Sequence, residues 1–168
     1  MSPGYHVDVK TSGLLQQYLA KVKNIKTVTD VGFLHSETYA DDTPVAYVAY
    51  LNEYGQHNPP RPFLKRTFEK NVNKWTKLIQ NVLKVKGLSR QSVHEAYNQV
   101  GIVAVGDVQK TIKAWSPSDP RYNKPATIRA KMRKSEGVRG KNQVGNDPYR
   151  VLHDTGTMID SVKYEVKD

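Results

Sequence analysis

The spacing of apolar residues predicts two strands and one helix in the first part of the chain. Tyr5 to Val9 alternates apolar and polar residues, as a short strand does. Thr11 or Ser12 can cap a helix, because a short polar side chain accepts the free backbone N–H groups of a first turn. The apolar positions of this helix share one face: Leu14, Leu15, Tyr18, Leu19 and Val22. Val28 to Leu34 is rich in β-branched and aromatic residues, which predicts the second strand.

Proline and glycine mark the boundaries of the next helix. Ser36 to Thr43 is polar and is predicted to be a loop. Pro44 suits the first turn of a helix, and Gly55 is placed to end it. Residues 58–62 contain three prolines, which lack the backbone N–H that a helix interior needs. The pattern therefore predicts an extended connector that leads into a further helix.

Two long amphipathic helices are predicted next. The apolar positions of the first cluster on one side at 100° per residue: Phe63, Leu64, Phe68, Val72, Trp75, Leu78, Ile79, Val82 and Leu83. The opposite side is basic and carries Lys65, Arg66, Lys70, Lys74, Lys77 and Lys84. Gly87 ends this helix and Ser89 begins the second, whose apolar face is Val93, Ala96, Tyr97, Val100, Val103, Ala104, Val108 and Ile112. Because the connection is so short, we expect the two helices to pack as an antiparallel pair.

Residues 116–150 differ in character from the rest. They are poor in apolar residues and rich in proline and glycine, and Arg121 to Arg150 holds nine basic residues against two acidic ones. We predict a long basic loop or arm with a brief helical turn at Thr127 to Met132. The chain closes with a short turn or helix at Met158 to Ser161 and a strand at Val162 to Val166. Strands and helices mixed in 168 residues predict a single α+β domain, residues 1–168.

Composition narrows the class of partner. The chain holds 26 Lys and Arg against 16 Asp and Glu, a formal charge of +10. Such a surface attracts nucleic acid, an acidic protein or a membrane face. No apolar run approaches the roughly 20 residues that span a bilayer, and no apolar segment near the N-terminus indicates a signal peptide. The absence of cysteine excludes disulfides. We expect assembly in the cytoplasm and no membrane partner.

Catalytic chemistry has no support in the sequence. Five histidines are present, but none lies in a metal-binding spacing: His6, His35, His57, His94 and His153. The chain has no glycine-rich phosphate-binding loop. Asp154-Thr155-Gly156 matches the tripeptide of aspartic proteases, but an aspartate that caps a helix or forms a turn accounts for it better. We therefore expect no enzymatic activity, no metal and no cofactor.

The basic arm leaves two interpretations open. Its Lys and Arg residues are interleaved with Trp115, Tyr122 and Tyr149, a pattern that favours contact with a nucleic-acid backbone. The alternative is a solvated loop that becomes ordered only against another protein. Zinc-finger, RNP and helix-turn-helix signatures are absent, so we expect any contact with DNA to be non-specific.

Three features, taken in order along the chain, resemble one protein family. They are Leu51-Asn52-Glu53-Tyr54-Gly55 followed by Pro60-Arg61-Pro62-Phe63-Leu64; Trp115-Ser116-Pro117 followed by Pro125-Ala126-Thr127 and Lys131; and Val151-Leu152-His153-Asp154-Thr155-Gly156 followed by Met158, Ser161 and Val162. In this order and spacing, residues 28–168 resemble the neck, tail-completion and virion-morphogenesis proteins of tailed double-stranded DNA bacteriophages.

The resemblance implies a fold, a function and a location. The fold is α+β, with a small antiparallel sheet packed against several amphipathic helices. The function is structural: a homo-oligomeric ring, a hexamer first and a dodecamer next, that joins the head connector to the tail in the neck of the virion. Its partners would be the head connector or adaptor and the tail terminator or tail tube proteins. Genomic double-stranded DNA passes through such a ring. A basic DNA-binding accessory protein is the alternative.

Three groups of candidate residues follow. Arg61, Pro62, Phe63 and Leu64 either contact a neighbouring subunit or only set a corner of the core, and Arg61 can pair with a carboxylate there. Asp154, Thr155 and Gly156 turn the chain into the last strand and are assigned to the same contact region. The arm residues are assigned to DNA or to an acidic partner ring: Arg121, Lys124, Arg129, Lys131, Arg133, Lys134, Arg139 and Lys141.

Overall fold

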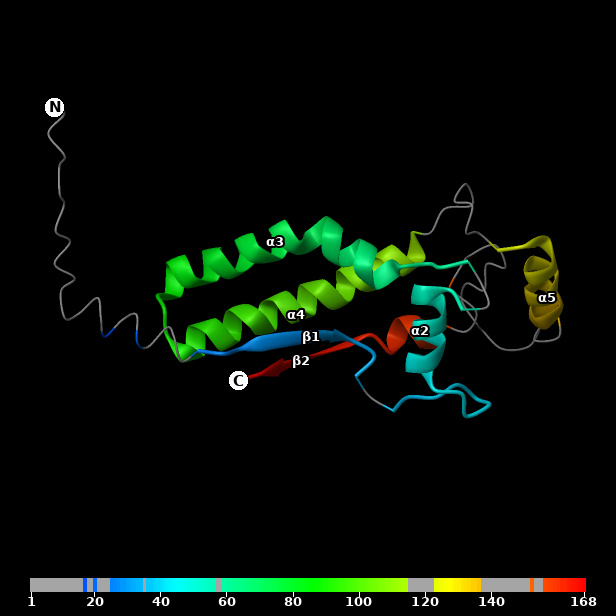
Figure 1. Cartoon of the computed structure of the whole chain (residues 1–168), viewed down its shortest axis with the longest axis horizontal. Coiled ribbons are helices and arrows are strands. Elements are labelled where there is room, and N and C mark those ends of the chain that lie inside the picture. Colours follow the sequence, from blue (N-terminus) through cyan, green and yellow to red (C-terminus); the bar gives the residue numbers. More distant parts are fainter. Residues whose placement is uncertain are drawn as a thin grey trace, which may run out of the picture.

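The computed structural model describes residues 17, 20, 25–34, 36–56, 59–114, 123–136, 152 and 156–168. Its elements are β1 (Val28–Gly32), α2 (Val45–Tyr54), α3 (Phe63–Lys86), α4 (Arg90–Lys113), α5 (Pro125–Glu136), α6 (Thr157–Asp160) and β2 (Lys163–Lys167). The fold is α+β, as predicted (Figure 1). The strand predicted at residues 5–9 lies outside the described residues, as does the helix predicted after it, apart from the helical positions Gln17 and Ala20.

The antiparallel pair of long helices is confirmed and forms the frame of the molecule. In Figure 1, α3 runs along one side of α4, and both strands run along another. The turn between α3 and α4 is short because Ser89 caps α4 at once. Its hydroxyl accepts the N–H of Ser92 at 3.1 Å, and the Ser92 hydroxyl accepts the N–H of Ser89 at 2.9 Å. This reciprocal box satisfies two backbone donors that a helix start leaves free.

The sheet consists of β1 and β2, paired antiparallel with Val28 opposite Lys167 and Gly32 opposite Lys163. One face lies on α4, where the Thr29 hydroxyl donates to the carbonyl of Tyr97 at 3.0 Å and the Tyr164 hydroxyl donates to Asn98 Oδ1 at 2.9 Å. Alternation along the strands sends neighbouring side chains to the opposite face. β1 ends at Gly32, earlier than predicted, and β2 is shifted by one residue from its predicted range.

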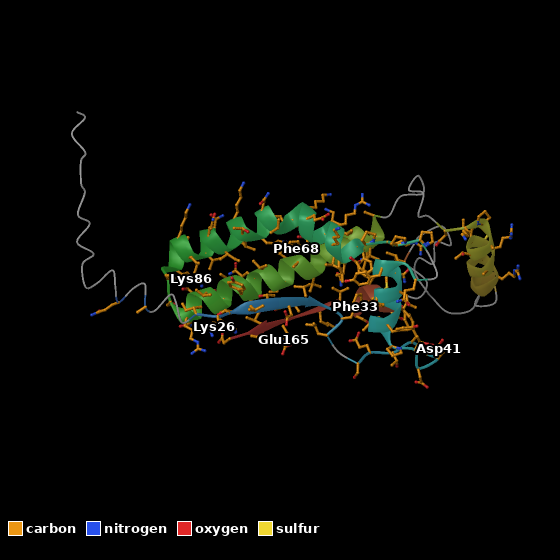
Figure 2. All side chains as sticks on the ribbon, viewed as in Figure 1. Lys26, Phe33, Asp41, Phe68, Lys86 and Glu165 are labelled. Carbon is orange, nitrogen blue, oxygen red and sulfur yellow. The ribbon has the colours of Figure 1, made fainter. Side chains whose placement is uncertain are left out.

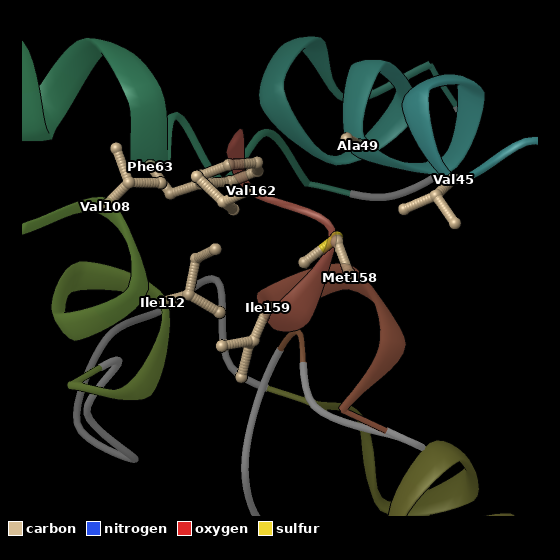
Figure 3. Close-up of a cluster of buried hydrophobic side chains, with 8 residues drawn as sticks. All are labelled: Val45, Ala49, Phe63, Val108, Ile112, Met158, Ile159 and Val162. Atoms are coloured by element: carbon tan, nitrogen blue, oxygen red, sulfur yellow. The ribbon is translucent and has the colours of Figure 1, made fainter. Parts of the chain in front are cut away.

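The hydrophobic core lies at the end of the molecule where α2 and α6 meet the start of α3 and the end of α4 (Figure 3). Its buried members come from four helices and the residue before β2: Val45, Ala49, Phe63, Val108, Ile112, Met158, Ile159 and Val162. Phe63 has no exposed surface, and its ring meets the ring of Phe33 edge-on at 6.1 Å. The helices predicted from Pro44 and from Phe63 are thus joined through one shared core.

The predicted core face of α4 is confirmed, but that of α3 is only partly so. Val93, Ala96, Val100, Ala104, Val108 and Ile112 of α4 are buried. On α3, by contrast, the buried residues are Phe63 and Thr67, and Phe68 keeps 57% of its surface exposed. The burial of Thr67 was not predicted from the sequence. Thr67 tolerates burial because its hydroxyl donates to the carbonyl of Phe63 at 2.7 Å, one turn earlier in the same helix.

The prediction of an arm with only a brief helical turn was wrong in part. Helix α5 covers Pro125–Glu136, twice the length of the predicted turn at residues 127–132. Pro125 suits a first helical position, and the alanines, lysines, arginines and methionine that follow are good helix formers. In Figure 1, α5 stands apart from the α3–α4 pair. Residues 116–122 and 137–150 lie outside the described part of the chain.

Candidate functional site

The corner between α2 and α3 is held by a carboxylate on one helix and backbone amides on the other. Pro62, the residue before α3, makes no side-chain cap, so the first N–H groups of α3 need another acceptor. Glu53 of α2 supplies it. Its Oε2 accepts the N–H of Leu64 and its Oε1 accepts the N–H of Lys65, both at 2.9 Å. The buried Glu53 side chain therefore caps a helix that begins ten residues later in the chain.

Arg61 and Gly55 complete this corner. The N–H of Arg61 donates to the carbonyl of Asn52 at 2.6 Å, and its guanidinium Nη1 donates to Asn52 Oδ1 at 3.3 Å. Gly55 ends α2 in the left-handed region at φ 76°, and a Cβ there would lie 2.5 Å from the backbone N of Pro60. Only glycine fits both conditions. The pairing of Arg61 with a carboxylate stays a prediction.

The candidate contact residues are therefore placed in different surroundings. Arg61 and Phe63 are buried within the corner, whereas Pro62 and Leu64 are partly exposed. Gly156 adopts a left-handed conformation at φ 86°, and its carbonyl accepts the N–H groups of Ile159 and Asp160. It thus turns the chain into α6, immediately before β2. Asp154 and Thr155 lie outside the described residues.

An apolar trough of about 630 Å³ opens beside this corner. Its floor is α4, through Val100, Ala104 and Val108, and its walls are β1, the end of α2 and the first half of α3. We define the apolar trough by the wall residues Val31, Tyr50, Tyr54, Leu64, Phe68 and Trp75 together with that floor. In Figure 2, Phe68 is labelled at the edge of α3 that faces α4 and the strands. The sequence placed Leu64, Phe68 and Trp75 on the apolar side of a helix but did not predict the trough.

Aromatic side chains at the rim of the trough are exposed to solvent. Tyr54 keeps 67% of its surface exposed, and Tyr50 stacks against it with ring centroids 4.8 Å apart. The ring of Phe68 lies edge-on to Trp75 at 6.1 Å, and the Trp75 indole N–H donates to Asp107 Oδ2 at 2.9 Å. Clustered exposed aromatic residues are typical of contact surfaces between proteins.

A second, polar hollow of about 240 Å³ lies between α3 and α4. We define this basic cleft by Arg66, Lys70 and Lys74 of α3 and Lys110 of α4, with Asn71, Asp107 and Thr111 between them. The sequence predicted a basic side of α3 but not that Lys110, from another helix, joins it. Figure 2 shows nitrogen-ended side chains along the outer side of α3.

The arm residues are only partly brought together. Lys124 is exposed just before α5, and Arg129 and Arg133 are exposed one turn apart on it. Lys131 and Lys134 also lie in α5. Arg121, Arg139 and Lys141 fall outside the described residues. The described part of the arm is therefore a short basic helix.

The described part of the chain shows neither a metal site nor a helix that could span a membrane. Among those residues, no three His, Asp or Glu side chains gather as metal ligands, and no helix is both long and apolar enough to cross a membrane. No model of a known protein family, no curated protein and no solved structure matches the chain.

Proposed function

We propose that this protein is a structural component of the neck of a tailed double-stranded DNA bacteriophage. In this role it joins the head connector to the tail as a homo-oligomeric ring around the DNA channel. The observation that carries the proposal is the apolar trough with its exposed aromatic rim. It lies where the segment 51–55 meets the segment 60–64, and these two segments carry the first part of the resemblance to neck proteins.

The chemistry of the trough favours a protein occupant over a small ligand. A small-molecule site presents a few polar groups that fix the orientation of the ligand. Here four of the polar side chains that line the trough are already engaged: Glu53 caps α3, Thr29 bonds to Tyr97, Asp30 bonds to Lys167, and Lys65 forms an ion pair with Glu69. What remains for a partner is apolar and aromatic surface, which gains most from contact with another apolar surface.

The occupant that we infer is a second copy of this chain. In a ring, each subunit offers one surface to the neighbour before it and a different surface to the neighbour after it. The trough would be one of these two surfaces, and a hexamer is the form expected first, with a dodecamer next. The head connector and the tail terminator or tail tube would then meet the two open ends of the ring.

The corner beside the trough prepares it for such contact. Because Glu53 ties α2 to the first turn of α3, Tyr50 and Tyr54 keep a fixed position relative to Leu64 and Phe68. A rigid surface loses less conformational entropy on binding than a mobile one. The corner thus serves the fold and the contact at once.

The test is the mass of the protein in solution, measured by light scattering over a range of concentrations. We expect a discrete multimer of the 19.0 kDa chain, and we expect Phe68→Lys to shift it toward the monomer. Val85→Lys is the matched control, because Val85 lies on the same helix, is 85% exposed and is not part of the trough. Equal masses for Phe68→Lys and the wild type would contradict the role of the trough.

A DNA-binding accessory protein is the second candidate function. It is favoured by the exposed Arg129 and Arg133 on α5, next to the exposed Lys124. This function predicts that the isolated monomer binds duplex DNA tightly and loses it steeply as salt rises. Tight binding by a protein that never forms a multimer would favour it over the ring.

A further inference from the structure

The basic cleft lies on a different side of the α3–α4 pair from the apolar trough. At 100° per residue, the directions of Arg66 and Lys70 differ by about 160° and about 120° from that of Leu64, which lines the trough. On α4, the direction of Lys110 differs by about 80° from that of Val100, which lines the trough. A ligand in the cleft therefore leaves the trough free for a protein.

Among the described residues that line the cleft, basic side chains outnumber acidic ones. Asp107 is the one carboxylate among these described residues, and it is already engaged by the ammonium group of Lys74 and by the indole N–H of Trp75. Within the described part of the chain, Lys70 and Lys110 make no ion pair. Like charges four residues apart on a helix repel each other, so Lys70 is repelled by both Arg66 and Lys74, and an anion beside it would relieve this repulsion.

We propose that the basic cleft binds phosphate groups of the duplex DNA backbone. Arg66, Lys70 and Lys74 follow one another at four-residue intervals, so the row extends over about 12 Å of helix. One DNA strand presents a phosphate about every 3.4 Å of helix axis, and because the strand also winds around that axis, neighbouring phosphates lie farther apart than this. The row is therefore long enough to reach more than one phosphate of a strand. Lys110 reaches the same hollow from α4 and widens the contact beyond a single line of charges.

The side chains of the cleft determine what kind of contact this is. Among the described residues that line it none is aromatic, so these residues offer unpaired bases no surface on which to stack. The amide of Asn71 and the hydroxyl of Thr111 donate to carbonyls of their own helices, Thr67 and Asp107. What remains is ammonium charge, above all that of Lys70 and Lys110, which contacts phosphates and carries no sequence information. The cleft thus binds DNA of any sequence.

This inference goes beyond the proposed ring and does not depend on it. It also differs from the arm-based alternative, because the cleft lies on the rigid α3–α4 pair and not on α5. If the ring forms, the cleft lets each subunit hold the DNA near its channel. If the ring does not form, a single subunit still binds DNA through the cleft.

The experiment measures the binding of a fluorescent duplex of about 20 base pairs to the full chain by anisotropy at several salt concentrations. Lys70→Gln with Lys110→Gln removes the two cations that make no ion pair in the described part of the chain. We expect affinity to fall about tenfold or more at low salt, and the slope of log K against log salt to fall by about two, since each lost phosphate contact contributes about 0.9.

Two controls make the result specific to the cleft. Lys77→Gln with Lys84→Gln removes the same charge from exposed positions on the basic side of α3 that do not line the cleft, and we expect a smaller loss than from the cleft pair, because Lys110 of α4 adds its charge only inside the cleft. Arg129→Gln with Arg133→Gln tests α5. Equal losses from the cleft pair and the Lys77 pair would overturn the proposal. So would a wild type that does not bind the duplex, or a loss confined to the α5 variant.

The failure of this inference can be told apart from failure of the ring. The same samples are measured by light scattering, and melting curves show that each variant is folded. The cleft variant is expected to keep the wild-type mass, whereas Phe68→Lys is expected to change the mass and to keep the salt slope of each subunit. A change in mass without a change in DNA affinity for the cleft variant would overturn the inference.

Discussion

The carboxylate of Glu53 accepts two backbone N–H groups at once, those of Leu64 and Lys65, each at 2.9 Å. This relationship joins the end of α2 to the start of α3 across a proline-rich connector. A carboxylate at a helix N-terminus also interacts favourably with the positive end of the helix dipole. One buried side chain therefore fixes the angle at which two helices enter the shared core.

Removing this cap should destabilise the whole fold. Glu53→Ala leaves two partly buried N–H groups without their acceptor, so we expect the free energy of unfolding to fall by about 1–2 kcal/mol. Glu53→Gln keeps one carbonyl oxygen and should lose less. Urea unfolding followed by circular dichroism measures both. Two variants as stable as the wild type would show that solvent replaces the cap without cost.

Gly101 and Gly106 on α4 should respond in opposite directions to the same substitution. A Cβ at Gly101 would overlap the ring of Tyr164, whereas a Cβ at Gly106 would meet nothing. Gly101→Ala should therefore destabilise the protein by about 1–3 kcal/mol through overpacking, even though alanine is the better helix former. Gly106→Ala should stabilise it by up to about 1 kcal/mol. Thermal melting of the two variants compares them, and a stabilised Gly101→Ala would contradict the close packing of β2 on α4.

Lys167 should make the stability of the sheet depend on alkaline pH. Its ammonium group bonds to Asp30 at 2.7 Å and lies 3.3 Å from Glu165, and these two carboxylates raise the pKa of Lys167 above its ordinary 10.5. A raised pKa means that the contribution is fully present below pH 10.5 and is lost as pH rises beyond it. The effect is small because the group is exposed and salt screens it.

The comparison of Lys167→Met with Lys163→Met tests this pH dependence. Lys163 is also exposed on β2, but it makes no ion pair within the described residues. We expect the melting temperature of the Lys167 variant to fall less than that of the wild type as the pH passes 10.5, and the Lys163 variant to follow the wild type. Identical curves for the two variants would exclude a specific role for the pair of carboxylates.

The elements of the fold were largely predictable because local signals mark them. The long helices α3 and α4 show apolar periodicity, and the sequence marks the end of α3 by Gly87 and the start of α4 by Ser89. Helix α5 was underestimated because its residues favour helix by intrinsic propensity and not by an apolar stripe. Periodicity alone detects only helices that bury a face.

The candidate sites were less predictable because they depend on contacts between distant segments. The sequence shows Glu53 and Leu64 but not that one caps the other. Likewise, Lys110 joins Lys70 only because α3 and α4 pack in one register, which the contacts of Lys74 and Trp75 with Asp107 fix. The apolar face of α3 was read as core because a stripe of apolar residues does not show which part of it the same chain covers.

Electron microscopy of the purified protein shows both whether the subunits close into a ring and how many subunits the ring contains. We expect closed rings with a central channel, with sixfold symmetry first and twelvefold next. We also expect Phe68→Lys to abolish the rings and Val85→Lys to leave them intact. Isolated 19.0 kDa particles, two-fold dimers or open chains at every concentration would contradict the proposed ring.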